Sequence, residues 1–508
     1  MPVLTAVDVL GVQRFIFSSN RLKDIVAGSW LVYWATSSEG TLKDLIPQER
    51  ILLGAGGNAV LEFDDLESAK NFATNYTRRL YEEAPGLNVV LVHHEYNPGQ
   101  LASALLKLKE KLEQAKLVPP VSAHLLGLSV TATCRETGLP ASGFDPTDLT
   151  SPLSSEILKR RKKINKAISR WAKFLPSPNF EFPLELDDLG RSIGDTSLIG
   201  IVHVDGNSVG AKIKDWLEDQ ESAPDKDVQR QYREWSKALD ELGHKALEAV
   251  VNRVCKAIKH DNGKVKTCGY PQELNFELKE RKGKIMLPLR PILLGGDDLT
   301  FVCDGRLALD LAVTALRVFR ESELPHLEKV TASAGVAIVR AHDSFFRAYR
   351  LCEELCASAK RRLREEDLAE EECALDWHID LPHPNESLAS LRKFLYQKEQ
   401  HELTARPYTL DEGPNYQTWT WFNKKLLRHL RGTDWKKHRN KVKKLLELAY
   451  EGPEKIKRKL EIWQTAFSDL KLPEPIDSNG FAGGKTPLVD AVELLDIHLS
   501  LEKPEGQI

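Results

Sequence analysis

The chain has 508 residues, a length that predicts two to four domains, and its 42% apolar and 29% charged residues are typical of a globular protein with a hydrophobic core. The net charge of −3 neither indicates nor excludes a nucleic-acid partner. Seven cysteines without a CxxC pair argue against a disulfide framework and a zinc ribbon, and the absence of a signal peptide and of a bilayer-length apolar run predicts a cytoplasmic protein without a membrane partner.

Residues 1–95 predict one unit of alternating strands and helices. The unit begins with Val3–Val9, whose β-branched and apolar residues favour a strand. Residues 50–63 predict two strands around a glycine turn. The remaining elements are expected as helices over 11–17, 22–35 and about 66–83, and a strand over 88–93.

The same order of elements returns in residues 196–385. A predicted strand, Ser197–Asp205, ends in an acid and is followed by a helix. Arg290–Leu294 then leads into Gly295-Gly296-Asp297-Asp298, where two adjacent glycines permit a tight turn and let a ligand come close to the backbone. The unit is completed by helices over about 306–320 and 344–363 and by a strand over 330–339.

The two units are predicted to be copies of one fold. Ile51-Leu52-Leu53-Gly54 matches Ile292-Leu293-Leu294-Gly295, and a slightly longer turn would put Gly56-Gly57-Asn58-Ala59 in the place of Gly295 to Asp298. We therefore expect an α+β protein with two ferredoxin-like units. The first copy lacks both carboxylates, so it should bind a metal poorly and serve as a wall or as a second nucleotide site.

Residues 96–195 are expected to form a helical connector, and residues 386–508 a helical C-terminal domain. The connector has a basic amphipathic stretch, 157–174, which fits either a solvated helix face or a surface that contacts phosphates. In the C-terminal domain, lysines and arginines interleave with aromatic residues. That mixture suits RNA backbone contact and base stacking, and it also fits an aromatic core under a charged face. The aromatic residues are Trp419, Trp421, Phe422 and Trp435.

Two neighbouring acids, Asp297 and Asp298, are unfavourable at a hairpin tip unless a cation neutralises them. In a ferredoxin-like sheet the first and third strands pair at the centre, so Asp205 should lie beside this tip. The three carboxylates could hold two Mg²⁺ or Mn²⁺ ions, one activating a ribose hydroxyl and the other neutralising a leaving pyrophosphate. The pattern predicts nucleotidyl transfer; a solvated hairpin tip is the alternative.

Further residues are candidates for nucleotide binding. Gly206, Asn207 and Ser208 open a helix, and free N–H groups at such a place suit phosphate oxygens. Gly295 and Gly296 of the turn would let the nucleotide approach the backbone.

Three residues have two interpretations each. Lys360 could reach a triphosphate or be a surface lysine. Ser333, on a central strand, could line a base pocket or be a buried hydroxyl. His378 could contact a ligand or be a structural histidine.

Taken together, these motifs resemble the CRISPR polymerase-like proteins, the large subunits of type III CRISPR effector complexes. The resemblance is carried by the Gly-Gly-Asp-Asp hairpin, Asp205-Gly206-Asn207, Ser333-Ala334-Gly335, Ala359-Lys360 and the opening Asp8–Phe17. It implies two palm domains and a cyclase that converts ATP to cyclic oligoadenylate second messengers. Asp297 and Asp298 match the catalytic carboxylates, and Asp205 matches a metal ligand.

The resemblance also implies partners: a guide RNA, a target RNA whose binding switches the cyclase on, and the other subunits of the effector complex. The chain departs from the family in three respects. It begins at the first palm, so we expect no HD nuclease and no DNA cleavage. Cys134 is the one recognisable cysteine of a zinc-binding connector, and Asn207 stands where a second acid is expected.

Two other functions remain open from the sequence. The chain could be a catalytically silent scaffold that binds guide RNA and other effector subunits. It could also be a stand-alone cyclic dinucleotide synthase similar to the GGDEF enzymes, although Asp298 replaces their glutamate.

Overall fold

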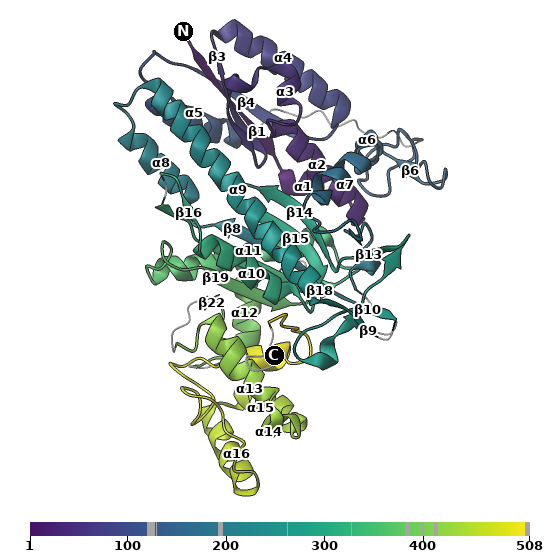
Figure 1. The fold of residues 1–508 in the computed structure, drawn as a ribbon, viewed down its shortest axis with the longest axis vertical. Helices are drawn as coiled ribbons and strands as arrows, with labels where there is room; N and C mark the ends of the chain where they lie inside the picture. Colours follow the sequence, from purple (N-terminus) through teal and green to yellow (C-terminus); the bar gives the residue numbers. More distant parts are fainter. Residues whose placement is uncertain are drawn as a thin grey trace.

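A computed structural model describes residues 1–118, 128, 130–190, 197–261, 263–326, 328–380, 386–398, 401–410 and 415–502. Figure 1 shows three parts along the long axis in chain order: an N-terminal sheet with its helices, a larger central sheet, and a helical C-terminal end. No helix within the described residues is long and apolar enough to cross a membrane. The expected domain boundaries at residues 195 and 385 lie outside the described residues.

The N-terminal sheet has four antiparallel strands in the order β2-β3-β1-β4. The first and third strands are thus central, as in the predicted ferredoxin-like unit. Helix α5 follows the fourth strand and packs on β1 and β4. The elements are β1 Val3–Leu10, α1 Val12–Ile16, α2 Leu22–Thr36, α3 Leu42–Leu45, a 3₁₀ turn Gln48–Arg50, β2 Ile51–Ala55, β3 Asn58–Phe63, α4 Leu66–Glu83, β4 Asn88–Glu95 and α5 Leu101–Leu117.

The central sheet has six strands in the order β14-β15-β8-β18-β19-β22. Its first four strands repeat the order and connections of the N-terminal sheet, which confirms the predicted duplication of an α+β unit. The elements are β8 Leu198–Gly206, α8 Val209–Asp219, α9 Asp225–Ala257, β14 Leu289–Gly295, β15 Asp298–Asp304, α10 Ala308–Arg320, β16 Glu323–Leu324, β17 Glu328–Lys329, β18 Ala332–Arg340, α11 Phe345–Glu365 and β19 Ala374–Ile379.

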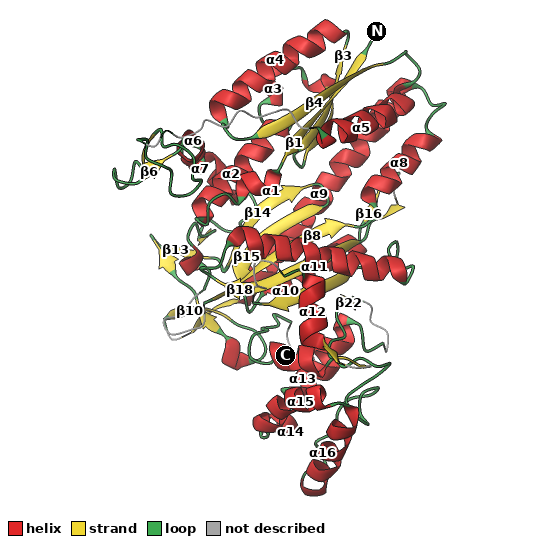
Figure 2. Cartoon of the chain, turned by 180° about the vertical axis from the view of Figure 1, so that it is seen from behind, coloured by secondary structure: helices red, strands yellow, loops and turns green. Residues whose placement is uncertain are grey.

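Helices cover both faces of the central sheet (Figure 2). Strand β18 is buried at every position except its last, the pattern of a strand between two helical layers. Gly335 lies directly against α11: a Cβ on Gly335 would be 1.9 Å from the Cys352 carbonyl oxygen. Gly200 lies directly against α10: a Cβ on Gly200 would be 2.3 Å from the Ala308 Cβ. Gly335 pairs with His203, and side chains alternate along β8, so α10 and α11 cover opposite faces.

The basic stretch of the connector forms two helices, and its arginines face the first unit. Arg160 is fully buried and donates to Glu156 and to the Phe15 carbonyl; Arg161 donates twice to Asp24. Buried carboxylates and a backbone carbonyl already bind these two arginines. For them, both predicted interpretations, a solvated face and a phosphate-binding surface, are therefore wrong. The connector elements are β5 Gly143–Phe144, β6 Pro152–Leu153, α6 Ser155–Arg161, α7 Ile164–Ala172, β7 Phe180–Glu181 and a 3₁₀ turn Leu186–Asp188.

Short strands lie between α9 and β14, and most of the helices after β19 form the C-terminal end. The inserted elements are β9 Ile258–Asp261, β10 Lys264–Thr267, a 3₁₀ turn Gln272–Leu274, β11 Phe276–Glu277, β12 Glu280–Arg281 and β13 Lys284–Met286. The last elements are α12 Leu388–Tyr396, β20 Gln397–Lys398, β21 His401–Glu402, β22 Tyr408–Thr409, a π-helix Trp421–Leu427, α13 Arg428–Leu430, α14 Thr433–Lys436, α15 Arg439–Glu451, α16 Pro453–Ala466 and α17 Leu488–Leu494.

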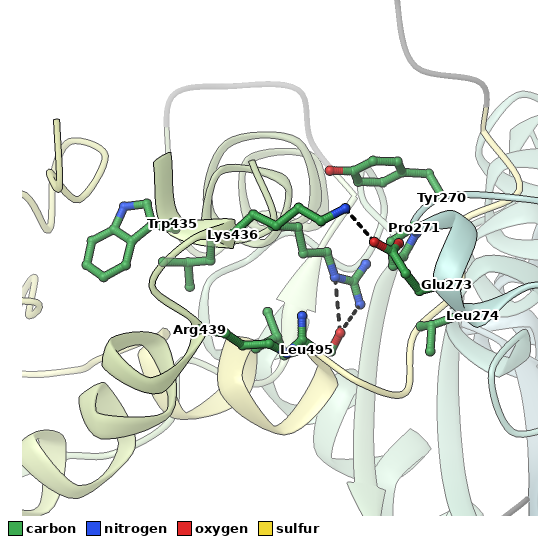
Figure 3. A pocket seen from close by; sticks show the side chains of 10 residues that line it. Tyr270, Pro271, Glu273, Leu274, Trp435, Lys436, Arg439 and Leu495 are labelled. Atoms are coloured by element: carbon green, nitrogen blue, oxygen red, sulfur yellow. Dashed lines mark hydrogen bonds and ion pairs between the residues drawn. The ribbon is translucent and has the colours of Figure 1, made fainter. Parts of the chain in front are cut away.

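The aromatic residues of the C-terminal end form its core. Trp419, Trp421, Phe422 and Trp435 are all buried, so base stacking on them is ruled out and the aromatic-core interpretation is the right one. A small cavity separates this end from the inserted strands (Figure 3). Across it, Lys436 donates to Glu273 at 2.5 Å. An exposed ion pair therefore connects the C-terminal end with the inserted elements across this cavity.

Candidate active site

The Gly-Gly-Asp-Asp hairpin is closed by a two-residue turn. Gly295 pairs with Asp298, which leaves Gly296 and Asp297 at the tip, and Gly296 has φ +63°, a conformation that glycine adopts without strain. Helix α9 supports the turn from one side: a Cβ on Gly243 would lie 2.3 Å from the Gly296 carbonyl oxygen. The tip is thus fixed in position by close backbone packing.

The sheet brings Asp205 to this hairpin, as the strand order predicted. Strand β15 pairs with β8 through Leu299 and Val204, and this register sets Asp298 beside Asp205 at the ends of the two central strands. The Asp297 carboxylate lies over Gly206, since a Cβ there would be 2.5 Å from its Oδ2. All three acids therefore meet at one corner of the central sheet.

The charge at this corner fits a cation. The pKa of the Asp297 carboxyl is raised to about 7, by burial first and then by the negative charges of Asp205 and Asp298. Asp298 Oδ1 is buried and accepts no hydrogen bond. A divalent ion would relieve both conditions, and carboxylate oxygens are the ligands that Mg²⁺ and Mn²⁺ prefer. As the side chains stand, no group of three His, Cys, Asp or Glu in the described part of the chain is arranged to hold a metal ion.

Lys360, on α11, lies in the site rather than on the open surface. Its ammonium donates to Asp205 Oδ2 and to the Gly206 carbonyl, both at 2.7 Å. The side chain is 20% exposed, so it is only partly shielded from solvent. The interpretation of Lys360 as a lysine that reaches the site is the one that the geometry favours.

The residues after Asp205 divide into two groups. Asn207 is buried and bonded inside the sheet: its Nδ2 donates to Thr331 Oγ1 at 3.0 Å, and its Oδ1 accepts from Ser333 Oγ at 2.9 Å. Ser333 is completely buried. These two side chains brace the turn after β8 and do not face a ligand space. Ser208, by contrast, is exposed and has φ +57° where α8 begins.

The amide groups at the start of α8 remain suited to phosphate oxygens. Helix α8 is 11 residues long, and no side chain caps its first turn. The earliest helical bonds are made by Ala211 and Lys212, which both donate to the Ser208 carbonyl. The N–H groups that precede them are the ones that a helix leaves without partners of its own.

His203 is a site neighbour that the sequence interpretation missed. Its Nδ1 lies 3.1 Å from Thr300 Oγ1 and 3.4 Å from Asp298 Oδ1, and its ring packs edge-on against Tyr349. Burial lowers its pKa, but the negative charge of the neighbouring Asp298 outweighs burial, so the pKa is raised. A histidine two residues before an acid on a central strand was the only sequence signal for this role. His378, in contrast, is buried with its pKa lowered to about 3, first by burial, and fits the structural interpretation.

Arg170 links the connector to the hairpin. It donates to the Leu294 carbonyl at 3.0 Å, and its guanidinium lies 3.9 Å from the Tyr33 ring centroid. Burial lowers its pKa to about 10. The residue just before the Gly-Gly-Asp-Asp turn is therefore held by a side chain from α7, which no local pattern in the sequence indicated.

The first unit carries a counterpart of the site, at a register different from the one predicted. Each hairpin has a β-bulge in its first strand and then a two-residue turn. The structural equivalent of Asp298 is therefore Asn58, and that of Asp297 is Gly57. The predicted longer turn, with Asn58 and Ala59 in these places, is wrong by one residue. Asn58 pairs with Asp8, which is thus the counterpart of Asp205.

Comparison with known proteins adds three findings. Residues 198–369 match the family model described as Cas10/Cmr2, second palm domain. No curated protein sequence matches the chain. Solved structures match its fold: a Csm1–Csm4 cassette in complex with AMPPNP aligns with a TM-score of 0.54 at 15% identity, over 98% of this chain and 69% of the other.

Two further structures give the same result. Csm1 of T. onnurineus aligns with a TM-score of 0.54 at 13% identity, over 98% of this chain and 70% of the other. A Csm1–Csm4 cassette in complex with cA4 aligns with a TM-score of 0.51 at 14% identity, over 97% and 70%. At these identities the likeness establishes a common fold.

Proposed function

We propose that the chain, whose residues 198–369 match the Cas10/Cmr2 second palm domain and whose fold is shared with Csm1, is a metal-dependent nucleotidyl cyclase that converts ATP to cyclic oligoadenylate. The observation that carries the proposal is the corner where Asp205, Asp297 and Asp298 meet beside the start of α8. Carboxylates for metal and free amide groups for phosphates lie together there, which is the requirement of phosphoryl transfer.

Each residue has a role in this proposal. Asp297 and Asp298 are the catalytic carboxylates, and with Asp205 they would hold two Mg²⁺ or Mn²⁺ ions, which supply activation of a ribose hydroxyl and neutralisation of pyrophosphate. Gly206 and Ser208 bring α8 amides to the phosphates, while Gly295 and Gly296 let the nucleotide approach the backbone. Lys360 neutralises triphosphate charge. Asn207 and Ser333 are positioning residues that fix the turn after β8.

The substrate and product are proposed from the structural relatives. Csm1–Csm4 cassettes have been solved in complex with one ATP, with pppApA and with cA4. By the same likeness we propose that the chain acts in the cytoplasm as the large subunit of a type III CRISPR complex, together with a Csm4-like subunit, a guide RNA and a target RNA.

The test is synthesis from ATP. The purified chain, alone and in a complex reconstituted with guide and target RNA, is incubated with ATP, GTP and Mn²⁺, and the products are identified by mass spectrometry. Asp297→Asn and Asp298→Asn should each reduce synthesis at least 100-fold. Asp219→Asn, an exposed acid at the end of α8, is the matched control and should leave synthesis unchanged.

Each alternative predicts another outcome. The first alternative, a catalytically silent scaffold, is supported by the Lys360–Asp205 bond, because the lysine occupies a proposed metal ligand. It predicts no phosphodiester product while the complex still binds RNA. A stand-alone cyclic dinucleotide synthase gives a two-base ring without RNA. Oligoadenylate rings formed only with target RNA support the proposal over both.

A further inference from the structure

The ion pair between Lys360 and Asp205 has a counterpart in the first unit. Lys116 Nζ lies 2.5 Å from Asp8 Oδ2, and Lys360 Nζ lies 2.7 Å from Asp205 Oδ2. Both lysines are on the helix that follows the fourth strand of their unit, and each is the sixteenth residue of that helix, α5 or α11. The two pairs therefore occupy the same place in the duplicated fold.

The surroundings of the two pairs differ. Opposite Asp8 stands the neutral Asn58, and Glu113 is the second acid on Lys116, at 2.9 Å. Lys360 faces Asp205 with Asp297 and Asp298 close by, so a single ammonium stands against three carboxylates. One ammonium thus faces two carboxylates in the first unit and three in the second, so the second unit leaves more negative charge uncompensated.

The position of the Lys360 ammonium determines what a metal ion would meet. Its two bonds go to Asp205 and to the Gly206 carbonyl, so it holds the acid that the proposed function assigns to metal binding. The Lys360 and Asp205 side chains are 20% and 39% exposed, which leaves both free to exchange partners when charged groups arrive. A triphosphate would offer Lys360 a stronger set of oxygens than one carboxylate.

We propose that Lys360 is a displaceable cation that occupies Asp205 until a triphosphate draws it away. In the ligand-free chain it competes with metal for Asp205; with nucleotide present it moves to the triphosphate and Asp205 becomes a metal ligand. Metal and nucleotide then bind with positive coupling. The nucleotide takes Lys360 away from Asp205 and so frees Asp205 for the metal, and the metal takes Asp205 away from Lys360 and so frees Lys360 for the nucleotide. The inference rests on the proposed function for the identity of the two ligands.

The test measures the binding of Mn²⁺ and of a non-hydrolysable triphosphate by the full chain, under conditions in which no product is formed. Mn²⁺ affinity is measured by the electron paramagnetic resonance signal of free Mn²⁺ without nucleotide, and α,β-methylene-ATP affinity by calorimetry in EDTA. Lys360→Gln should bind Mn²⁺ at least tenfold more tightly than the parent chain and the triphosphate at least tenfold more weakly. Lys360→Arg, which keeps the charge, should leave Mn²⁺ affinity within threefold of the parent.

Two control variants separate exchange at Asp205 from a general loss of positive charge. Lys116→Gln removes the equivalent lysine of the first unit. Lys212→Gln removes a lysine of α8 whose ammonium donates to the Lys329 carbonyl. Both should bind Mn²⁺ as the parent does. Unchanged or weaker Mn²⁺ binding by Lys360→Gln, or equal tightening in Lys212→Gln, overturns the inference.

The outcome does not depend on catalysis. A chain that makes no product but shows the tightening keeps the inference and loses the cyclase proposal. A chain that makes cyclic oligoadenylate with unchanged Mn²⁺ affinity in Lys360→Gln keeps the cyclase and loses the inference.

Discussion

Gly295 and Gly56 are in direct backbone contact: a Cβ on Gly295 would lie 2.4 Å from the Gly56 Cα. Each belongs to the hairpin of its own unit, so the two hairpins meet at their tips. Gly295 also pairs with Asp298, and its position sets that of both acids. The acid-bearing hairpin is therefore held by the unit that carries no acids at its own turn.

Replacing Gly295 by alanine should separate the two hairpins. The new methyl would meet backbone, which cannot rotate away, so one hairpin must shift. We expect synthesis of oligoadenylate to fall at least 100-fold, measured by mass spectrometry, with secondary structure by circular dichroism unchanged. Gly28→Ala is the control, because a methyl there lies at an ordinary 3.4 Å from its neighbours; equal loss in both variants would contradict the explanation.

Arg170→Met should loosen the hairpin from the connector side. The change keeps the length of the side chain but leaves the Leu294 carbonyl without this donor, at a cost of about 1–3 kcal/mol. We expect kcat to fall about tenfold with the KM for ATP nearly unchanged, because the carboxylates move while the α8 amides stay. A rise in KM without loss of kcat would place Arg170 in nucleotide binding instead.

Ionisation of Asp297 should destabilise the metal-free chain. Its pKa is about 7 in the folded state, against about 4 when unfolded. A group whose folded pKa is raised contributes stability that is fully present below pH 4 and is lost as the pH rises through 7. Asp297→Asn, which cannot ionise, should raise stability at pH 8 by roughly 1–3 kcal/mol.

Thermal unfolding in EDTA between pH 4 and 8 checks this prediction. The difference in Tm between Asp297→Asn and the parent chain should be small at pH 4 and grow toward pH 8. Asp219→Asn, at an exposed position, should track the parent at every pH. A difference that is constant across the range would mean that the Asp297 charge is not the cause.

Removal of Asp490 should destabilise the C-terminal end. Asp490 and Arg406 form a fully buried pair at 3.0 Å, and Asp490 also accepts from Thr404 and Tyr408. Asp490→Ala leaves a buried guanidinium with Glu493 as its remaining acid, which typically costs about 3–5 kcal/mol. Urea denaturation measures the loss, and Asp490→Ala with Arg406→Met should lose less than the two single variants added together.

The sequence by itself determined the two ferredoxin-like units and the acid-bearing hairpin. The apolar runs around Gly295 and Gly56 and the helices that follow are local patterns, and local patterns are set by residues close in the chain. The topological rule that first and third strands pair at the centre then brought Asp205 to the hairpin, and the structure has it there. One predicted register was wrong: both hairpins have two-residue turns, so aligning their glycine pairs placed Asn58 at the position of Asp297, whereas its structural equivalent is Asp298.

Only the tertiary structure decided what surrounds those acids. The contact of Gly295 with Gly56, the hold of Arg170 on Leu294, and the bonds of Lys360 to Asp205 join residues far apart in sequence. The same holds for Asn207 and Ser333, which bond each other instead of facing a ligand. Such pairings depend on which side chains a fold buries together and which charges it leaves uncompensated, and no periodicity along the chain encodes either quantity.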